Sequence, residues 1–197
     1  MPLSEVQIAN MALHHLKVKR QISALTDDTV EARAVNLFWE TARDDALSAA
    51  DWSFARRRAT LAQDSAAPPS EWGYAYLLPD DFLVARFIED GVKVRHHANE
   101  IKFRVERPTD SLVLYTDAAS AVLVYTAQYK PVAYWTSSFV SLMARSLASE
   151  MASGLVDTAR KRVAFDEYRF ARAEAARLDS EQEVQGEPDP PLIAARR

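Results

Sequence analysis

The sequence offers few side chains whose types and spacing would support catalysis or metal binding. Its four histidines form two adjacent pairs, His14-His15 and His96-His97, and two of its pairs of adjacent aspartates are candidates for acid–base chemistry: Asp44-Asp45 and Asp80-Asp81. Adjacent residues on a strand point to opposite faces, so the two histidines of the second pair cannot chelate one ion together. General acid catalysis needs one carboxyl group in an apolar pocket, which neighbouring aspartates that face apart do not provide. We therefore expect no metal site, no cofactor and no enzymatic activity.

Composition narrows the function classes further. The chain has no cysteine, which excludes disulfides, thiolate ligands and cysteine nucleophiles, and its four glycines stand too far apart for a phosphate loop. The net charge of −4 argues against a dedicated nucleic-acid binder, because phosphate neutralisation normally leaves such domains strongly basic. Neither a signal peptide nor an apolar run of bilayer length is visible, so we expect a protein of the cytoplasm with no membrane partner.

A cluster of arginines follows two aromatic residues in DWSFARRRATL, residues 51–61. Trp52 and Phe54 are predicted to anchor the exit of a long helix into a β core. If the segment is a strand, Arg56, Arg57 and Arg58 divide between its two faces. The cluster has three interpretations: an edge strand protected by charge, a docking surface for acidic groups of a neighbouring subunit, or a nucleic-acid contact. The third ranks last, because no aromatic stacking platform is interleaved with the arginines.

Helical periodicity predicts elements on both sides of this cluster. A helix over residues 4–16 begins with a capping box of Ser4 and Gln7. A longer helix begins at Asp28, and its solvent face holds Glu40, Arg43, Asp44 and Asp45. Near the C-terminus, an apolar face begins at Ser137 and ends at Gly154, a suitable left-handed cap. Asp157 caps a last helix, which we expect to pack lengthwise against another helix.

From about Trp52 to Tyr129 the apolar pattern alternates, which predicts short strands. The segments are SFARRRATL, VKVRHH, EIKFRVE, SLVLYTD and AVLVYTAQY. The gaps between them are too short for helical crossovers, so the strands should be antiparallel. LLPDDF indicates a proline turn, in which the aspartates satisfy backbone groups before a strand resumes.

The predicted fold is α+β. A bundle of about four helices comprises residues 1–50 and 136–184, an antiparallel β-rich insertion occupies 51–135, and an extended C-terminal arm occupies 185–197. The arm, QGEPDPPLIAARR, contains prolines that stiffen it and cannot continue a helix.

Several motifs together resemble a known family. They are ANMAL and HHL in the first helix, ISALTDDTVEA before the long helix, DWSFARRRATL, YAYLLPDDFLVAR, LMARSLASEMA and ARKRVAFDEYRFARAEAARLDS. Over residues 3–182 the chain resembles the head-to-tail adaptor proteins of tailed phages, particularly the tail tubular protein A type of short-tailed phages. The matching motifs are structural rather than catalytic.

The resemblance implies a structural adaptor located in the virion at the head-tail junction and assembled in the host cytoplasm. Such adaptors form a homo-dodecameric ring that joins the portal protein to the tail nozzle, a tail tubular protein B-like partner. The ring lines the channel through which double-stranded DNA passes. Their C-terminal segment reaches the portal, so the portal-binding candidates are Pro190, Pro191, Leu192, Ile193, Arg196 and Arg197.

A closed ring of identical subunits needs two different surfaces that complement each other. We expect the arginines Arg56, Arg57 and Arg58 of one subunit to meet the carboxylates Glu40, Asp44 and Asp45 of the next. The basic residues of the last helix are interpreted as subunit or portal contacts, with DNA contact as the lesser option.

Two alternative functions stay open: an arginine-rich nucleic-acid-binding protein and a small oligomeric enzyme with a carboxylate site.

Overall fold

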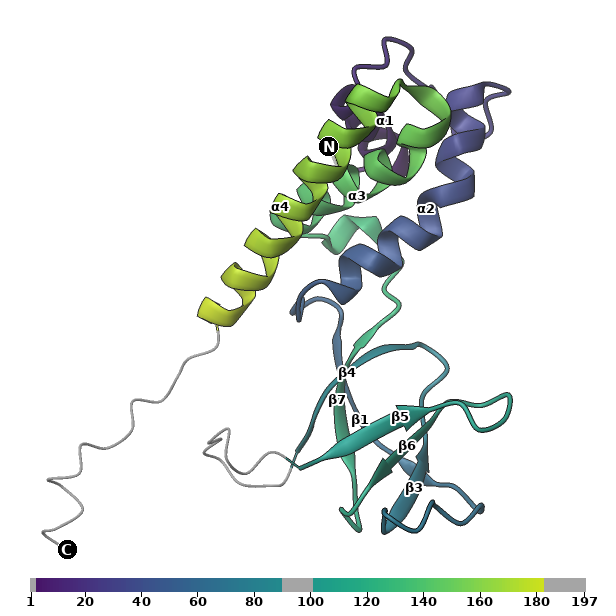
Figure 1. The fold of residues 1–197 in the computed structure, drawn as a ribbon, viewed down its shortest axis with the longest axis vertical. Helices are drawn as coiled ribbons and strands as arrows, with labels where there is room; N and C mark the ends of the chain where they lie inside the picture. The colour runs from purple at the N-terminus through teal and green to yellow at the C-terminus, as the bar shows by residue number, and fades with distance from the viewer. Residues whose placement is uncertain (1–2, 90–100, 183–197) are drawn as a thin grey trace, which may run out of the picture.

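A computed structural model describes residues 3–89 and 101–182, with side chains described up to Arg177. The protein is α+β: four α-helices lie at one end of an elongated molecule and antiparallel strands at the other (Figure 1). The helices are α1 (Glu5–His15), α2 (Val30–Ser48), α3 (Ser137–Leu155) and α4 (Thr158–Gln182), and a short 3-10 helix, η2 (Val132–Tyr134), precedes α3. The predicted helices and antiparallel β part are confirmed. The predicted C-terminal arm lies outside the described residues.

The predicted caps of the first and last helices are confirmed. The Ser4 hydroxyl accepts from the Gln7 amide at 3.2 Å, and the Ser4 amide donates to the Gln7 side chain at 2.9 Å. At the start of α4, the Asp157 carboxylate accepts from the Arg160 amide at 2.8 Å. Each cap satisfies backbone donors that have no partner within the helix.

Two predicted helix signals are wrong. The cap of α2 is Thr29, whose hydroxyl accepts from the Ala32 amide at 3.1 Å, whereas Asp28 pairs with Arg33. Gly154 lies inside α3, and the helix ends when Val156 becomes extended at φ −139°. The next helix begins two residues later, so the chain has no room for a left-handed turn there.

The left-handed cap occurs instead at Lys17, directly after α1. Lys17 has φ 58°, its amide donates to the His14 carbonyl at 2.9 Å, and the Val18 amide donates to the Leu13 carbonyl at 3.0 Å. This pair of bonds is the Schellman pattern, which closes a helix when one residue turns left-handed.

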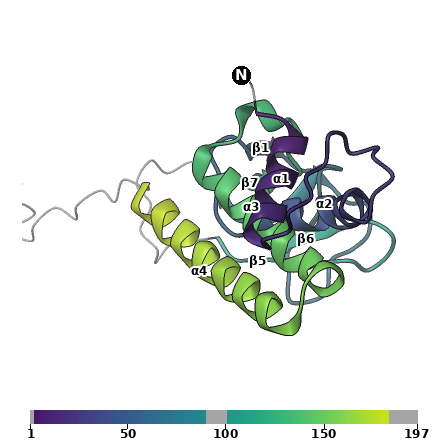
Figure 2. The same cartoon turned by 90° about the horizontal axis from the view of Figure 1, so that it is seen from above.

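One hydrophobic core holds the four helices together around α3, against which α1, α2 and α4 all pack (Figure 2). The predicted apolar face of α3 is fully buried in this core: Phe139, Leu142, Met143, Leu147 and Met151. From α4, Ala164, Tyr168 and Ala175 are buried as well. The predicted lengthwise packing of α4 is therefore confirmed, with α3 as its partner.

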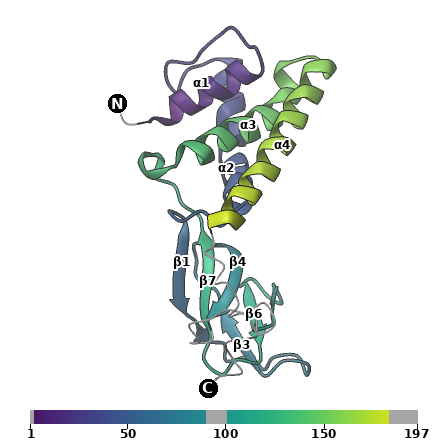
Figure 3. The ribbon, with the colours of Figure 1, turned by 90° about the vertical axis from the view of Figure 1, so that its left-hand side faces the viewer.

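The strands form two antiparallel sheets with a separate core. Their bounds are β1 (Arg56–Thr60), β2 (Ala62–Gln63), β3 (Tyr74–Leu77), β4 (Phe82–Glu89), β5 (Phe103–Glu106), β6 (Val113–Thr116) and β7 (Val122–Ala127). The orders are β1-β7-β4 and β2-β3-β6-β5. The sequence pattern did not predict β2 or β3, and the predicted segment VKVRHH lies outside the described residues. Figure 3 shows the strands extending away from the helices along the long axis.

Trp52 and Phe54 anchor the chain in the helical core, so their predicted place in a β core is wrong. Trp52 packs on Phe54 at 6.1 Å between ring centroids and on the edge of Phe139 at 5.2 Å. Its indole N–H donates to the Ala46 carbonyl near the end of α2 at 2.9 Å. The amides of Ala55 and Arg56 both donate to the Trp52 carbonyl, which makes a turn against the helices before β1 starts.

Phe139 is the residue on which this aromatic cluster converges, since it also contacts Trp135 at 4.7 Å. We expect Phe139→Ala to lower the free energy of unfolding by about 3 to 5 kcal/mol, because it opens a cavity in a fully buried site. Urea denaturation monitored by circular dichroism measures the change. The matched control is Tyr134→Ala on an exposed ring, which should cost less than about 1 kcal/mol. Equal losses in the two variants would contradict the assignment of the core.

Candidate functional site

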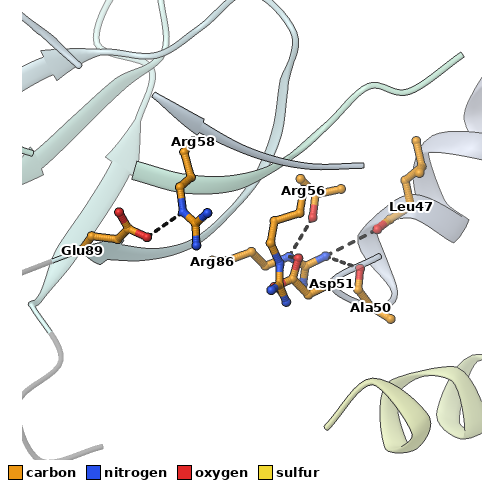
Figure 4. A network of polar contacts seen from close by, with 8 residues as sticks. Leu47, Ala50, Asp51, Arg56, Arg58, Arg86 and Glu89 are labelled. Carbon is orange, nitrogen blue, oxygen red and sulfur yellow. Dashed lines mark hydrogen bonds and ion pairs between the residues drawn. The ribbon is translucent and has the colours of Figure 1, made fainter. Parts of the chain in front are cut away.

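Each arginine of the predicted interface cluster binds a carboxylate of its own chain. Arg56 lies 2.5 Å from Asp51. Arg57 lies 2.7 Å from Asp81, and Arg58 lies 2.7 Å from Glu89 (Figure 4 shows the first and third of these arginines). All three arginines are exposed residues of β1, so a neighbouring subunit can still reach them. Their contact with another subunit stays a prediction, but their charge is already partly compensated.

Asp81 connects this cluster to a buried hydroxyl group. The Tyr125 hydroxyl donates to the Asp81 carboxylate at 2.9 Å, and Tyr125 is the cross-strand partner of Arg57. Burial, followed by the bond to Asp81, raises the pKa of Tyr125 to about 12. The turn predicted at LLPDDF is present, since the Phe82 amide donates to the Pro79 carbonyl at 3.0 Å. The Asp81 side chain, however, serves two side chains and not the backbone groups that the sequence predicted.

The predicted carboxylates of α2 separate into an exposed one and two that are engaged inside the molecule. Glu40 is exposed, at 3.7 Å from Arg43. Asp44 accepts from Arg43 at 2.8 Å and from the Gln128 side chain at 3.0 Å. Asp45 accepts from two residues of α4, the Tyr168 hydroxyl and the Arg172 guanidinium.

Arg43 is buried, so its predicted place on the solvent face of α2 is wrong. Only 4% of the residue is exposed, and the Asp44 carboxylate compensates its charge. A buried charge is tolerated when it is paired and hydrogen-bonded in this way. The pair also leaves Asp44 less available to a second subunit than the sequence suggested.

A further arginine, Arg86 of β4, connects the strands to the helices. Its guanidinium donates to the Ala50 carbonyl at 2.5 Å, to the Leu47 carbonyl at 3.4 Å and to the Thr126 hydroxyl at 2.8 Å (Figure 4). Asp51 lies 4.0 Å away. The last turn of α2 holds no basic residue of its own. A cation at a helix C-terminus interacts favourably with the helix dipole, and here a strand provides it.

Arg86 was not among the predicted functional residues, although the sequence holds two signals for its role. The end of α2 has neither a basic residue nor a glycine to complete it, so its last carbonyls need donors from elsewhere. Arg86 also interrupts the apolar run of FLVARFIE, where a charged residue requires a partner.

The outer faces of α2 and α4 expose large apolar side chains, which the sequence analysis also missed. On α2, Val30 and Leu37 are exposed, and on α4, Val163 and Phe170 are exposed. The members of each pair are seven residues apart, or about two helical turns, so they share one side of their helix. Phe170 is 75% exposed and Leu37 71%. Phe165 of α4 is exposed too, with the Arg169 guanidinium 6.0 Å from its ring centre.

The described residues hold neither a metal-binding cluster nor a helix of membrane-spanning character, and some predicted site residues lie outside them. Across residues 3–89 and 101–182 there is no group of three histidine, cysteine, aspartate or glutamate side chains that would hold a metal ion. The same residues contain no helix with the length and apolar character needed to cross a membrane. The His96-His97 pair and the portal-binding candidates lie outside the described residues: Pro190, Pro191, Leu192, Ile193, Arg196 and Arg197.

Comparison with known proteins assigns no family to this arrangement. No protein-family model matches the chain, and no curated protein sequence matches it significantly.

Arg86 should matter far more to stability than an arginine of the exposed cluster. We expect Arg86→Met to destabilise the protein by about 3 kcal/mol, because it leaves the part-buried Leu47 and Ala50 carbonyls without their charged donor. Arg58→Met is the matched control and should cost less than about 1 kcal/mol, since its ion pair is exposed. Chemical denaturation measures both, and hydrogen exchange at the end of α2 should rise only in the Arg86 variant. A similar loss in both variants would contradict the capping role.

Because Tyr125 is buried and bonded to Asp81, we expect the free energy of unfolding to fall as the pH rises into the alkaline range. The unfolded tyrosine has a pKa of about 10, and the folded one about 12. The folded state therefore holds this proton more tightly, so its stabilisation is complete below pH 10 and is lost as pH rises toward 12. We expect Tyr125→Phe to make stability fall less steeply over this interval, as measured by urea midpoints at several pH values. Tyr134→Phe controls for the substitution, and an unchanged slope in the Tyr125 variant would refute the assignment.

Proposed function

We propose that this chain is a structural adaptor at the head-tail junction of a tailed phage. Its copies associate side by side into a dodecameric ring, which joins the portal to the tail nozzle and surrounds the channel for double-stranded DNA. The resemblance over residues 3–182 supports the proposal. The structural observation on which it rests is that two helices, α2 and α4, expose large apolar side chains on their outer faces.

These faces suit association with other protein surfaces. Burying a side chain such as Leu37 or Phe170 contributes roughly 1.5 to 3 kcal/mol before the costs of association. A single weak contact of this kind becomes firm when many are made around a closed circle. A chain with one apolar helix face on either side of α3 is therefore suited to act as a link between two identical neighbours.

The elongated shape supports the same function. The helices and the strands lie at opposite ends of the long axis (Figure 1). A ring built through the helices would leave the strands free to meet a second partner, which in this proposal is the nozzle. The net charge of −4 also suits a channel wall along which phosphates must slide.

The two alternative functions gain less support. A nucleic-acid binder needs basic groups free to meet phosphates, whereas Arg56, Arg57 and Arg58 each bind a carboxylate of the same chain. An enzyme with a carboxylate site would use Asp80-Asp81. Asp81 instead binds Arg57 and Tyr125, which gives it a structural role.

Electron microscopy tests the proposal directly. The purified chain is mixed with the portal protein encoded by the same genome, and we expect an added ring beneath the portal with the portal's rotational symmetry. The portal alone is the control. Portal particles that stay bare at saturating concentrations of the chain would overturn the proposed function.

The same images test the arginine cluster as a subunit contact. Arg57→Glu reverses the charge next to Asp81 and should weaken the ring if Arg57 meets a neighbouring carboxylate. Intact rings from this variant would remove Arg57 from the interface while leaving the adaptor function in place.

A further inference from the structure

We infer that one side of α4 binds the phosphate backbone of duplex DNA. This basic side is formed by residues that are all exposed: Lys161, Arg162, Phe165, Arg169 and Arg172. The inference rests on the proposed function, in which DNA passes through the ring, and it identifies the element that contacts the DNA. From the sequence, DNA contact by this helix ranked below subunit and portal contacts, and the geometry of the helix reverses that order.

The charges of α4 are separated onto different sides of the helix. Each member of the basic side lies three or four residues from another member, which is the spacing of neighbours on one side of a helix. Glu167 and Glu174 lie two residues after Phe165 and Arg172, which is just over half a turn, so they point to the other side. Asp166 lies on the boundary between the two sides. The basic side thus contains no carboxylate of its own helix.

The cations of the basic side are available to another molecule. Within the part of the chain that the structure describes, Lys161 and Arg162 have no carboxylate partner. The guanidinium of Arg169 lies 6.0 Å from the centre of the Phe165 ring, a contact that leaves its charge in place. Arg172 binds Asp45, yet 47% of its side chain is exposed. The arginines of β1 differ, because each of them binds a carboxylate of its own chain.

The length of the basic side suits a DNA strand. From Lys161 to Arg172 the helix rises about 16 Å, at roughly 1.5 Å per residue. B-DNA carries a phosphate about every 3.4 Å along each strand, so a straight row of cations of this length lies near several phosphates at any register. Guanidinium groups also bind phosphate oxygens in a bidentate manner.

An acidic protein surface is the main competing partner. It would need carboxylates at positions that match the row, whereas a DNA strand presents phosphates regularly. The carboxylates that the sequence suggested for a neighbouring copy include Asp44 and Asp45, and both are engaged within their own chain. The regular spacing of phosphates and the engagement of these carboxylates together favour DNA.

The place of α4 leaves its basic side accessible and its contact with DNA weak. The helix lies at one edge of the helical end and packs against α3 through buried residues such as Ala164 and Ala175 (Figure 2). The chain has a net charge of −4, so the rest of its surface opposes binding to phosphates. One copy therefore binds DNA weakly, and copies around a ring add their contacts. Such a contact positions DNA in the channel and still lets it slide.

DNA binding by two matched variants tests the inference. Arg162→Gln and Arg169→Gln are combined in one variant, and Arg57→Gln and Arg58→Gln in a control that changes the net charge equally. Fluorescence anisotropy of a labelled duplex of mixed sequence is measured at several salt concentrations, and circular dichroism checks folding. We expect the α4 variant to bind at least about tenfold more weakly and to lose about two from the slope of log affinity against log salt. The control should change the affinity less than about twofold, because its arginines are already compensated.

A photochemical measurement locates the DNA on α4. The chain has no native cysteine, so Phe165→Cys and Phe170→Cys each provide a single site for a photoreactive label. Both phenylalanines are exposed residues of the same helix, but only Phe165 belongs to the basic side. We expect the label at position 165 to give at least about fivefold more DNA adduct than the label at 170, since the two positions point to different sides of the helix. The reaction is run with the free chain and with portal-bound assemblies, so weak binding by one copy is still tested.

The outcomes separate the inference from the proposed function. Equal adducts at the two positions, no adduct in either setting, or an unchanged DNA affinity in the α4 variant would overturn the inference, and rings on the portal would then leave the adaptor function intact. Polyglutamate that displaces the DNA at equal charge concentration would also overturn it, in favour of an acidic protein partner. Adducts concentrated at position 165 without rings on the portal would support the basic side and count against the adaptor.

Discussion

The arrangement of this molecule depends on one guanidinium group at the joint between helices and strands. Arg86 reaches from β4 to the Leu47 carbonyl in the last turn of α2, to the Ala50 carbonyl just after it, and to the Thr126 hydroxyl of β7. Trp52 reaches the same turn from the other direction, through its bond to the Ala46 carbonyl. The end of a helix that lacks its own cap is thus completed by groups that follow it in the chain. The same bonds that complete the helix therefore also connect it to the sheets.

Most charged groups near this joint are engaged within the chain, and this determines how the molecule can meet others. Asp51, Asp81 and Glu89 hold the β1 arginines, and Asp45 holds α4 against α2. The side chains that stay available for contacts with other molecules are the exposed apolar residues of α2 and α4 and a few charged residues on the same helices. Association through these apolar residues would draw its strength from the hydrophobic effect.

Local sequence patterns were sufficient to predict the helices and the helical core. The features that were not predicted are side chains whose partners lie far away in the sequence. Helical periodicity sufficed for Phe139 and the rest of the α3 face, and the Ser4 capping box depends on residues only three positions apart. Arg43 and the β1 arginines were misplaced or incompletely described because their partners depend on tertiary folding; Arg58 and Glu89 are 31 positions apart. Gly154 was predicted as a cap for a related reason: α3 continues to Leu155, and the chain becomes extended only at Val156, just before α4 starts at Thr158. The exposed stripes of α2 and α4 resemble buried ones in sequence, and only packing around α3 distinguishes them.

The elongated shape has a mechanical consequence. The sheets extend along the long axis from their attachment to the helices, where Arg86 and Gln128 donate hydrogen bonds to α2 and to the turn that follows it (Figure 3). A small rotation at that attachment is amplified into a large displacement at the distant tip of the strands. The bonds at this joint therefore determine how accurately the tip of the strands is positioned relative to the helices.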